Sequence, residues 1–224
     1  MTSFLTPTFI ISVLIALSVH EWAHGFVAYK LGDATAKMEG RLTLNPIAHL
    51  DPIGTLLFIL VGFGWGKPVP VDPRYFKNVK RDTALVSIAG PISNLLMALF
   101  AFGVLLLVER QAVMGMASAM VVHGGSSVFT QLTSELMIDF LHINLVLMAF
   151  NLLPIAPLDG SKILRAFIPL KYEYRYEDFM QQGPKILLIL ILLGQLFHVP
   201  ILSVWIGVIV APVLKVFGVV AGLL

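Results

Sequence analysis

The chain contains no cysteine, and this absence excludes disulfide bonds and thiolate metal ligands. Any metal ion must therefore be held by histidine, aspartate or glutamate. Charge is also scarce, because only 12% of the 224 residues are Asp, Glu, Lys or Arg, whereas 58% are hydrophobic. A formal net charge of +2, spread along the chain, indicates no nucleic acid as partner. The composition is typical of a protein whose surroundings are a lipid bilayer.

Long apolar runs predict an all-α polytopic membrane protein with about five to six transmembrane helices. These runs cover residues 7–31, 83–108, 136–153 and 184–224, and the last one turns near residue 198. Between the first two runs, glycines and prolines predict a short β or re-entrant element near residues 34–75. We expect residues 1–224 to form a single integral-membrane domain without a separate soluble domain. The first run is expected to be a retained span, since residues 1–8 lack the basic residues of a cleavable signal.

The distribution of Lys and Arg predicts the orientation in the membrane. Basic residues gather after the first run, before the second and after the third, whereas residues 109–135 contain only Arg110. This asymmetry places the basic segments in the cytosol and the N-terminus outside. We expect the plasma membrane of a prokaryote, with the active site toward the cytosolic side.

The most informative string is HEWAH at residues 20–24, which follows a stretch without any charged residue. On a helix this spacing places His20 and His24 one turn apart on the same face, where both can bind one zinc ion. Glu21 between them is then placed to act as the general base of a metalloprotease. Ionisable groups at this depth in a membrane are costly unless they line a cavity and have a function.

A third ligand is expected from the cytosolic end of another span. The string NLLPIAPLDG at residues 151–160 ends the third run, and its prolines stop the helix before Asp159. Irregular backbone at membrane depth is tolerated where it lines a cavity or is buried in protein. The carboxylate of Asp159 would complete a set of two nitrogen ligands and one oxygen ligand, which leaves the fourth tetrahedral position for water.

Together with AGPISN at residues 89–94, these motifs resemble the site-2 protease family of intramembrane zinc metalloproteases. The resemblance implies one Zn²⁺ held by His20, His24 and Asp159, and Glu21 as general base. It also implies that Asn151 holds the substrate carbonyl or its oxyanion. Many members carry a PDZ domain, which this sequence has no room for, so a compact form is expected. The implied function is hydrolysis of peptide bonds within or near transmembrane segments of other membrane proteins.

The segment that follows residue 65, GKPVPV, suits an extended edge better than a helix. We predict that Val69 and Val71 bind the locally unwound substrate as an added strand.

Several alternatives remain open from the sequence. The same His/Asp cluster could serve a membrane transporter of ions or metals. Asp159 could cap a helix, Asn151 could join helices, and residues 90 and 94 could serve helix packing. His49 is a rival metal ligand, although a loop or cavity-edge role is preferred.

Overall fold

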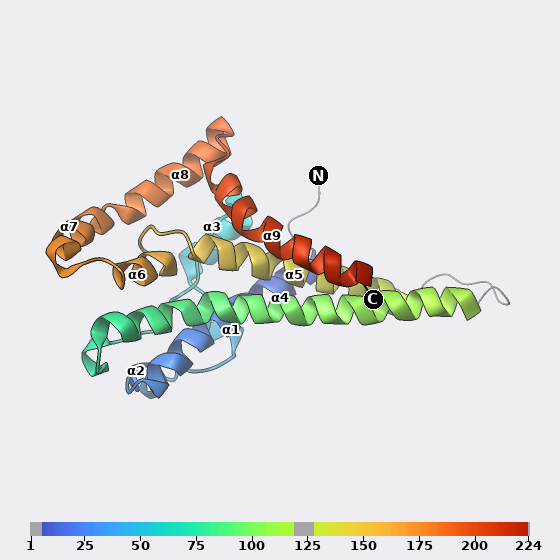
Figure 1. The fold of residues 1–224 in the computed structure, drawn as a ribbon, viewed down its shortest axis with the longest axis horizontal. Coiled ribbons are helices and arrows are strands. Elements are labelled where there is room, and N and C mark those ends of the chain that lie inside the picture. The colour runs from blue at the N-terminus through green and yellow to red at the C-terminus, as the bar shows by residue number, and fades with distance from the viewer. Residues whose placement is uncertain (1–5, 119–127, 224) are drawn as a thin grey trace.

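The computed structural model describes residues 6–118 and 128–223, and within them nearly all regular structure is helical (Figure 1). The helices are α1 (Pro7–Lys30), α2 (Thr35–Met38), α3 (Pro52–Val61), α4 (Val79–Ser118), α5 (Val128–Asn151), α6 (Asp159–Arg165), α7 (Leu170–Gln181), α8 (Gly183–Phe197) and α9 (Ile201–Leu223). Short 3-10 turns lie at Pro46–His49 and Pro73–Tyr75. The predicted all-α class is confirmed.

Among the described residues, four helices are long and apolar enough to cross a membrane, namely α1, residues 79–108 of α4, α5 and α9. Helices α7 and α8 meet at a 49° bend and give a fifth crossing if they form one broken span. The predicted count of five to six is therefore approximate. Helix α4 continues to Ser118, beyond the end predicted at residue 108, and the centre of the predicted 109–135 loop lies outside the described residues.

Helices α1, α4 and α5 pack against one another and form the centre of the protein. Helix α1 begins where the Thr6 hydroxyl accepts a hydrogen bond from the Phe9 N–H, with Pro7 in the first turn. Helix α9 packs against α5, where Trp205 donates to the Ala149 carbonyl at 2.8 Å. Many large apolar side chains of the spans are exposed, which is expected of helices that face lipid.

The predicted β or re-entrant element near residues 34–75 is mainly a short helix and a loop. Helix α3 is 10 residues long, begins at the cap formed by Asp51 and ends at Gly62, which has φ +73°. Ten helical residues span about 15 Å, which is half of a bilayer core of about 30 Å. In the described part of the chain, β pairing is limited to one antiparallel bridge between Leu50 and Gly66.

The connection from α5 to α6 is tight because Gly160 lies directly against the end of α5. A Cβ atom at this position would overlap the carbonyl groups of Leu152 and Leu153. Beyond the turn, Lys80 at the start of α4 donates to the Ile168 carbonyl at 2.8 Å. These contacts fix the first turn of α6, and with it Asp159, relative to α4 and α5.

Candidate metal centre

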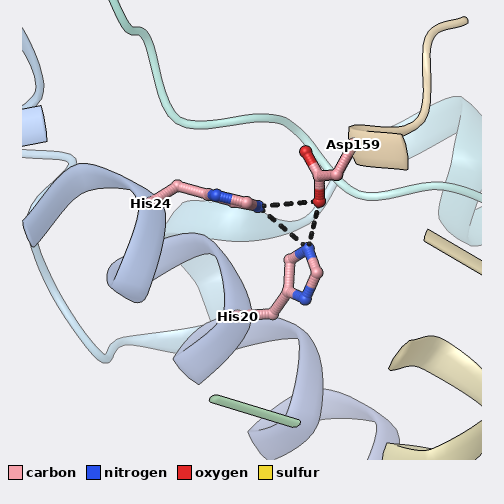
Figure 2. Close-up of side chains that lie close together, drawn as sticks. All are labelled: His20, His24 and Asp159. Atoms are coloured by element: carbon pink, nitrogen blue, oxygen red, sulfur yellow. Dashed lines mark hydrogen bonds and ion pairs between the residues drawn. The ribbon is translucent and has the colours of Figure 1, made fainter. Parts of the chain in front are cut away.

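Three polar side chains from two distant parts of the sequence meet inside the apolar bundle (Figure 2). His20 and His24 extend from adjacent turns of α1, and Asp159 is the first residue of α6. Oδ2 of Asp159 lies 3.2 Å from Nε2 of His20 and 3.1 Å from Nε2 of His24. The two Nε2 atoms are 3.0 Å apart, and all three residues are buried. The structure thus brings together the three predicted metal ligands.

The far side of each imidazole is held by a hydrogen bond that fixes which nitrogen faces the centre. Nδ1 of His24 lies 2.7 Å from the backbone carbonyl of Val86, which can only accept, so Nδ1 carries the hydrogen. Nδ1 of His20 lies 2.5 Å from Oδ1 of Asn94, an acceptor in the same sense. In the neutral form, both histidines therefore direct an unshared electron pair on Nε2 toward Asp159.

This arrangement suits a bound cation. Three atoms with unshared electron pairs converge, and Oδ2 of Asp159, although buried, accepts no hydrogen bond from any residue that the structure describes. Buried polar groups without a partner are uncommon and destabilising. Two imidazole nitrogens and one carboxylate oxygen form the ligand set of catalytic zinc sites that keep a position open. Asp159 does not cap α6, since the first turn of that helix has no side-chain cap.

Helix α4 leaves space for an ion through Gly90. A Cβ atom at this position would lie 2.5 Å from Cε1 of His20 and 2.5 Å from Nε2 of His24. Real Cβ atoms do not approach other atoms so closely, so any side chain here would displace the imidazoles. Gly90 and Asn94, which the sequence suggested for helix packing, thus lie against the centre itself.

Glu21 lies beside the centre, and its position is fixed by the backbone of the segment formed by residues 66–72. Oε2 of Glu21 accepts a hydrogen bond of 2.8 Å from the N–H of Val69. Prolines precede and follow Val69, so its N–H is the sole backbone donor of residues 68–70. This contact was not predicted, because a backbone donor leaves no signature in the side-chain pattern.

The 66–72 segment is tied down at several points besides Glu21. Arg41 donates to the carbonyls of Lys67 and Pro68 at 2.8 and 3.2 Å. Asp33, which is fully buried, accepts from the N–H of Asp72 at 2.7 Å. These bonds hold the segment against the C-terminal half of α1, where it covers the centre.

A cavity of about 260 Å³ opens at the centre between α1, the 66–72 segment and the end of α5. Its wall includes Glu21, Val69, Val71 and Asn151 together with the three metal-binding candidates. Nδ2 of Asn151 donates to the Leu147 carbonyl at 3.0 Å, which leaves its second hydrogen available to the cavity. Lys162 also lines the cavity, and its Nζ lies 3.9 Å from Oδ1 of Asp159.

The rival ligand His49 lies elsewhere. Its Nε2 is 2.8 Å from the Thr43 carbonyl, and it does not belong to the group formed by His20, His24 and Asp159. His49 lies in the 3-10 turn Pro46–His49, which agrees with the loop role preferred from the sequence.

Comparison with known proteins identifies the family. The family model "Peptidase family M50" matches residues 8–194. The chain belongs to peptidase family M50. The resemblance to the site-2 proteases is thereby confirmed.

Individual relatives of this M50 peptidase are described as zinc metalloproteases. "Putative zinc metalloprotease YwhC" of Bacillus subtilis is 44% identical over 165 residues, which are 74% of this chain and 71% of the relative. "Putative zinc metalloprotease Rip2" of Mycobacterium tuberculosis is 32% identical over 86% of this chain and 67% of the relative. Rip2 of Mycolicibacterium smegmatis is 30% identical over 80% and 64%. No solved structure matches the chain. Family and apolar helices together make this M50 peptidase an integral membrane metallopeptidase.

Substitution of Gly90 by alanine should impair metal binding without unfolding the protein. Overpacking of this kind costs about 1–3 kcal/mol, so zinc should bind roughly tenfold to a hundredfold more weakly. Gly103→Ala, on the same helix, is the matched control because a Cβ there meets no atom within 4 Å. Zinc affinity is measured by chelator competition on the purified protein. Equal affinity in the two variants would contradict the proposed location of the ion.

Proposed function

We propose that this chain is a zinc-dependent intramembrane endopeptidase that cleaves transmembrane proteins, in the manner of regulated intramembrane proteolysis. The observation that carries the proposal is the convergence of His20, His24 and Asp159 beside Glu21 in one buried cavity. The histidines and Glu21 lie on a helix long enough to cross the membrane. The names of the M50 relatives support zinc as the cofactor. The one group of candidate ligands among the described residues supports one ion per chain.

The protein residues have separate tasks in this reaction. His20, His24 and Asp159 would hold the zinc ion, which would supply polarisation of the peptide carbonyl and a bound water whose pKa is lowered toward about 7. The carboxylate of Glu21 accepts the proton of the attacking water and passes it to the leaving amine. The hydrogen bond from Val69 aims one carboxylate oxygen and leaves the other free to exchange this proton.

Asn151 is proposed to stabilise the oxyanion that forms as the carbonyl is attacked. Its amide lines the cavity and retains one N–H hydrogen beyond the bond to Leu147. Preorganised donors of this kind contribute about 2.7–4 kcal/mol to transition-state stabilisation.

A helical substrate must unwind before its carbonyls become accessible, and the 66–72 segment is proposed to hold the unwound part. In an extended chain, backbone groups two residues apart point to the same side. The N–H of Val69 points to Glu21, so the groups of Val71 are expected on that side as well. Neither the Val71 N–H nor the Val69 carbonyl is engaged by another group of residues 6–118 and 128–223. Substrate strand addition would use these groups directly beside the catalytic carboxylate.

The proposed location is the plasma membrane of a prokaryote, with the site toward the cytosol. Basic residues at the ends of α1, α4 and α6 support this orientation. Residues 1–224 are proposed to act as one membrane domain whose partners are lipid and transmembrane substrates. Transport of ions through the same cluster is not favoured, because the chain belongs to a peptidase family.

Substitutions in the cavity should separate metal binding from catalysis. Glu21→Gln should lower cleavage of single-span reporter proteins by about 10²–10⁴-fold, and Asn151→Leu by about 10²–10³-fold. Both variants should retain zinc, whereas Asp159→Ala should bind it much more weakly. Cleavage is measured on a panel of reporters reconstituted with each purified variant. Undiminished cleavage by Glu21→Gln would exclude Glu21 as general base.

A photo-crosslinking residue at Val71 should capture reporter substrate in the Glu21→Gln background, which binds without cleaving. The same probe at Leu196, which is exposed on α8 away from the cavity, is the control. Crosslinked products are separated by mass. Capture at position 196 but none at position 71 would refute the proposed strand addition.

A further inference from the structure

A line of buried amides crosses the three central helices and ends at the metal centre. It begins at the backbone carbonyl of Phe140 on α5, which accepts from Nδ2 of Asn144 at 2.8 Å. Oδ1 of Asn144 accepts from Nδ2 of Asn94 on α4 at 2.8 Å, and Oδ1 of Asn94 faces Nδ1 of His20 at 2.5 Å. Both asparagines have no exposed surface.

All hydrogen bonds of this line are donated in one direction, which the Phe140 carbonyl at its end determines. A backbone carbonyl can only accept, so Asn144 must direct its NH₂ group toward Phe140 and its oxygen toward Asn94. Asn94 must then donate to that oxygen, which leaves its own oxygen for His20. The hydrogen of neutral His20 is thereby required on Nδ1, and Nε2 keeps its electron pair for the metal.

We propose that Asn144 is a positioning residue for the metal centre and acts through Asn94 on His20. Without Asn144, the amide of Asn94 is free to rotate and to present its NH₂ group to the imidazole. Nδ1 would then have to accept, and the hydrogen would move to Nε2, where it points at the metal position. His24 needs no such relay, because the Val86 carbonyl fixes its hydrogen directly.

The location of Asn144 supports a task beyond joining helices. If Asn144 only joined α5 to α4, the bond from Asn94 to Asn144 would suffice, and Asn94 would not need to contact α1. Here Asn94 faces a metal-binding candidate on α1, and Asn144 lies on the helix that leads into the turn before Asp159. Partners behind a metal ligand set its tautomer and orientation, and their loss costs about 10–100-fold in metal affinity.

The test measures zinc affinity of the full-length protein in detergent by chelator competition. Asn144→Leu keeps the side-chain size and removes the relay, and it should weaken zinc binding about tenfold. Asn94→Leu should weaken zinc binding at least as much. The double variant should bind zinc no more weakly than Asn94→Leu alone. Leu145→Ala, the buried neighbour of Asn144 on α5, is the control. It should lower the thermal stability and leave zinc affinity unchanged.

Wild-type affinity in Asn144→Leu would overturn the proposal, and so would independent, multiplying effects of the two asparagine substitutions. The inference rests on the proposed role of His20 as a zinc ligand, and different results would refute the inference and that role. Absence of zinc binding by the wild type would refute that role, whereas failure of the relay leaves wild-type binding intact.

A second measurement needs no variant. In histidine ¹⁵N spectra of the zinc-loaded wild type, His20 should show a hydrogen on Nδ1 that exchanges slowly with solvent, and metal on Nε2. Coordination through Nδ1, or fast exchange of its hydrogen, would overturn the relay even if Asn144→Leu failed to fold.

Discussion

Three unshared electron pairs, on Nε2 of His20, Nε2 of His24 and Oδ2 of Asp159, lie within 3.2 Å of one another in an apolar interior. No hydrogen is available between these atoms when Nδ1 of each imidazole holds it, so the group requires a cation to be stable. The surrounding fold serves this requirement. Helix α1 carries two of the proposed ligands, and the first residue of α6 is the third. Helix α4 leaves space at Gly90 and provides the carbonyl of Val86.

The same constraint bears on the loop that lies beside the centre. A loop that lies at membrane depth needs hydrogen-bond partners for its backbone N–H and C=O groups. The 66–72 segment has such partners in part, in Arg41, Asp33 and the catalytic candidate Glu21. The Val71 N–H and the Val69 carbonyl remain for the proposed substrate strand. One contact thus both anchors the segment and orients the carboxylate, which links the proposed substrate strand to the proposed base.

Much of the centre could be predicted from the sequence, because its signals are local. Spacing of four residues places His20 and His24 on one helix face, and two prolines mark the turn before Asp159. The end of α4 was predicted too early, since a helix can extend beyond the apolar part that the bilayer requires. The role proposed for Asn144 depends on how α4 and α5 are rotated against each other, and a lone asparagine in an apolar run does not reveal this. The contact from the Val69 N–H involves backbone alone, so side-chain patterns do not encode it.

The most direct test of this account is zinc K-edge X-ray absorption on the purified, zinc-loaded protein. We predict two imidazole nitrogens and oxygen ligands at about 2.0–2.2 Å, with the loss of one oxygen and weaker zinc retention in Asp159→Ala. A spectrum with three imidazoles, or one with oxygen ligands alone, would contradict the assignment of His20, His24 and Asp159 as the metal centre.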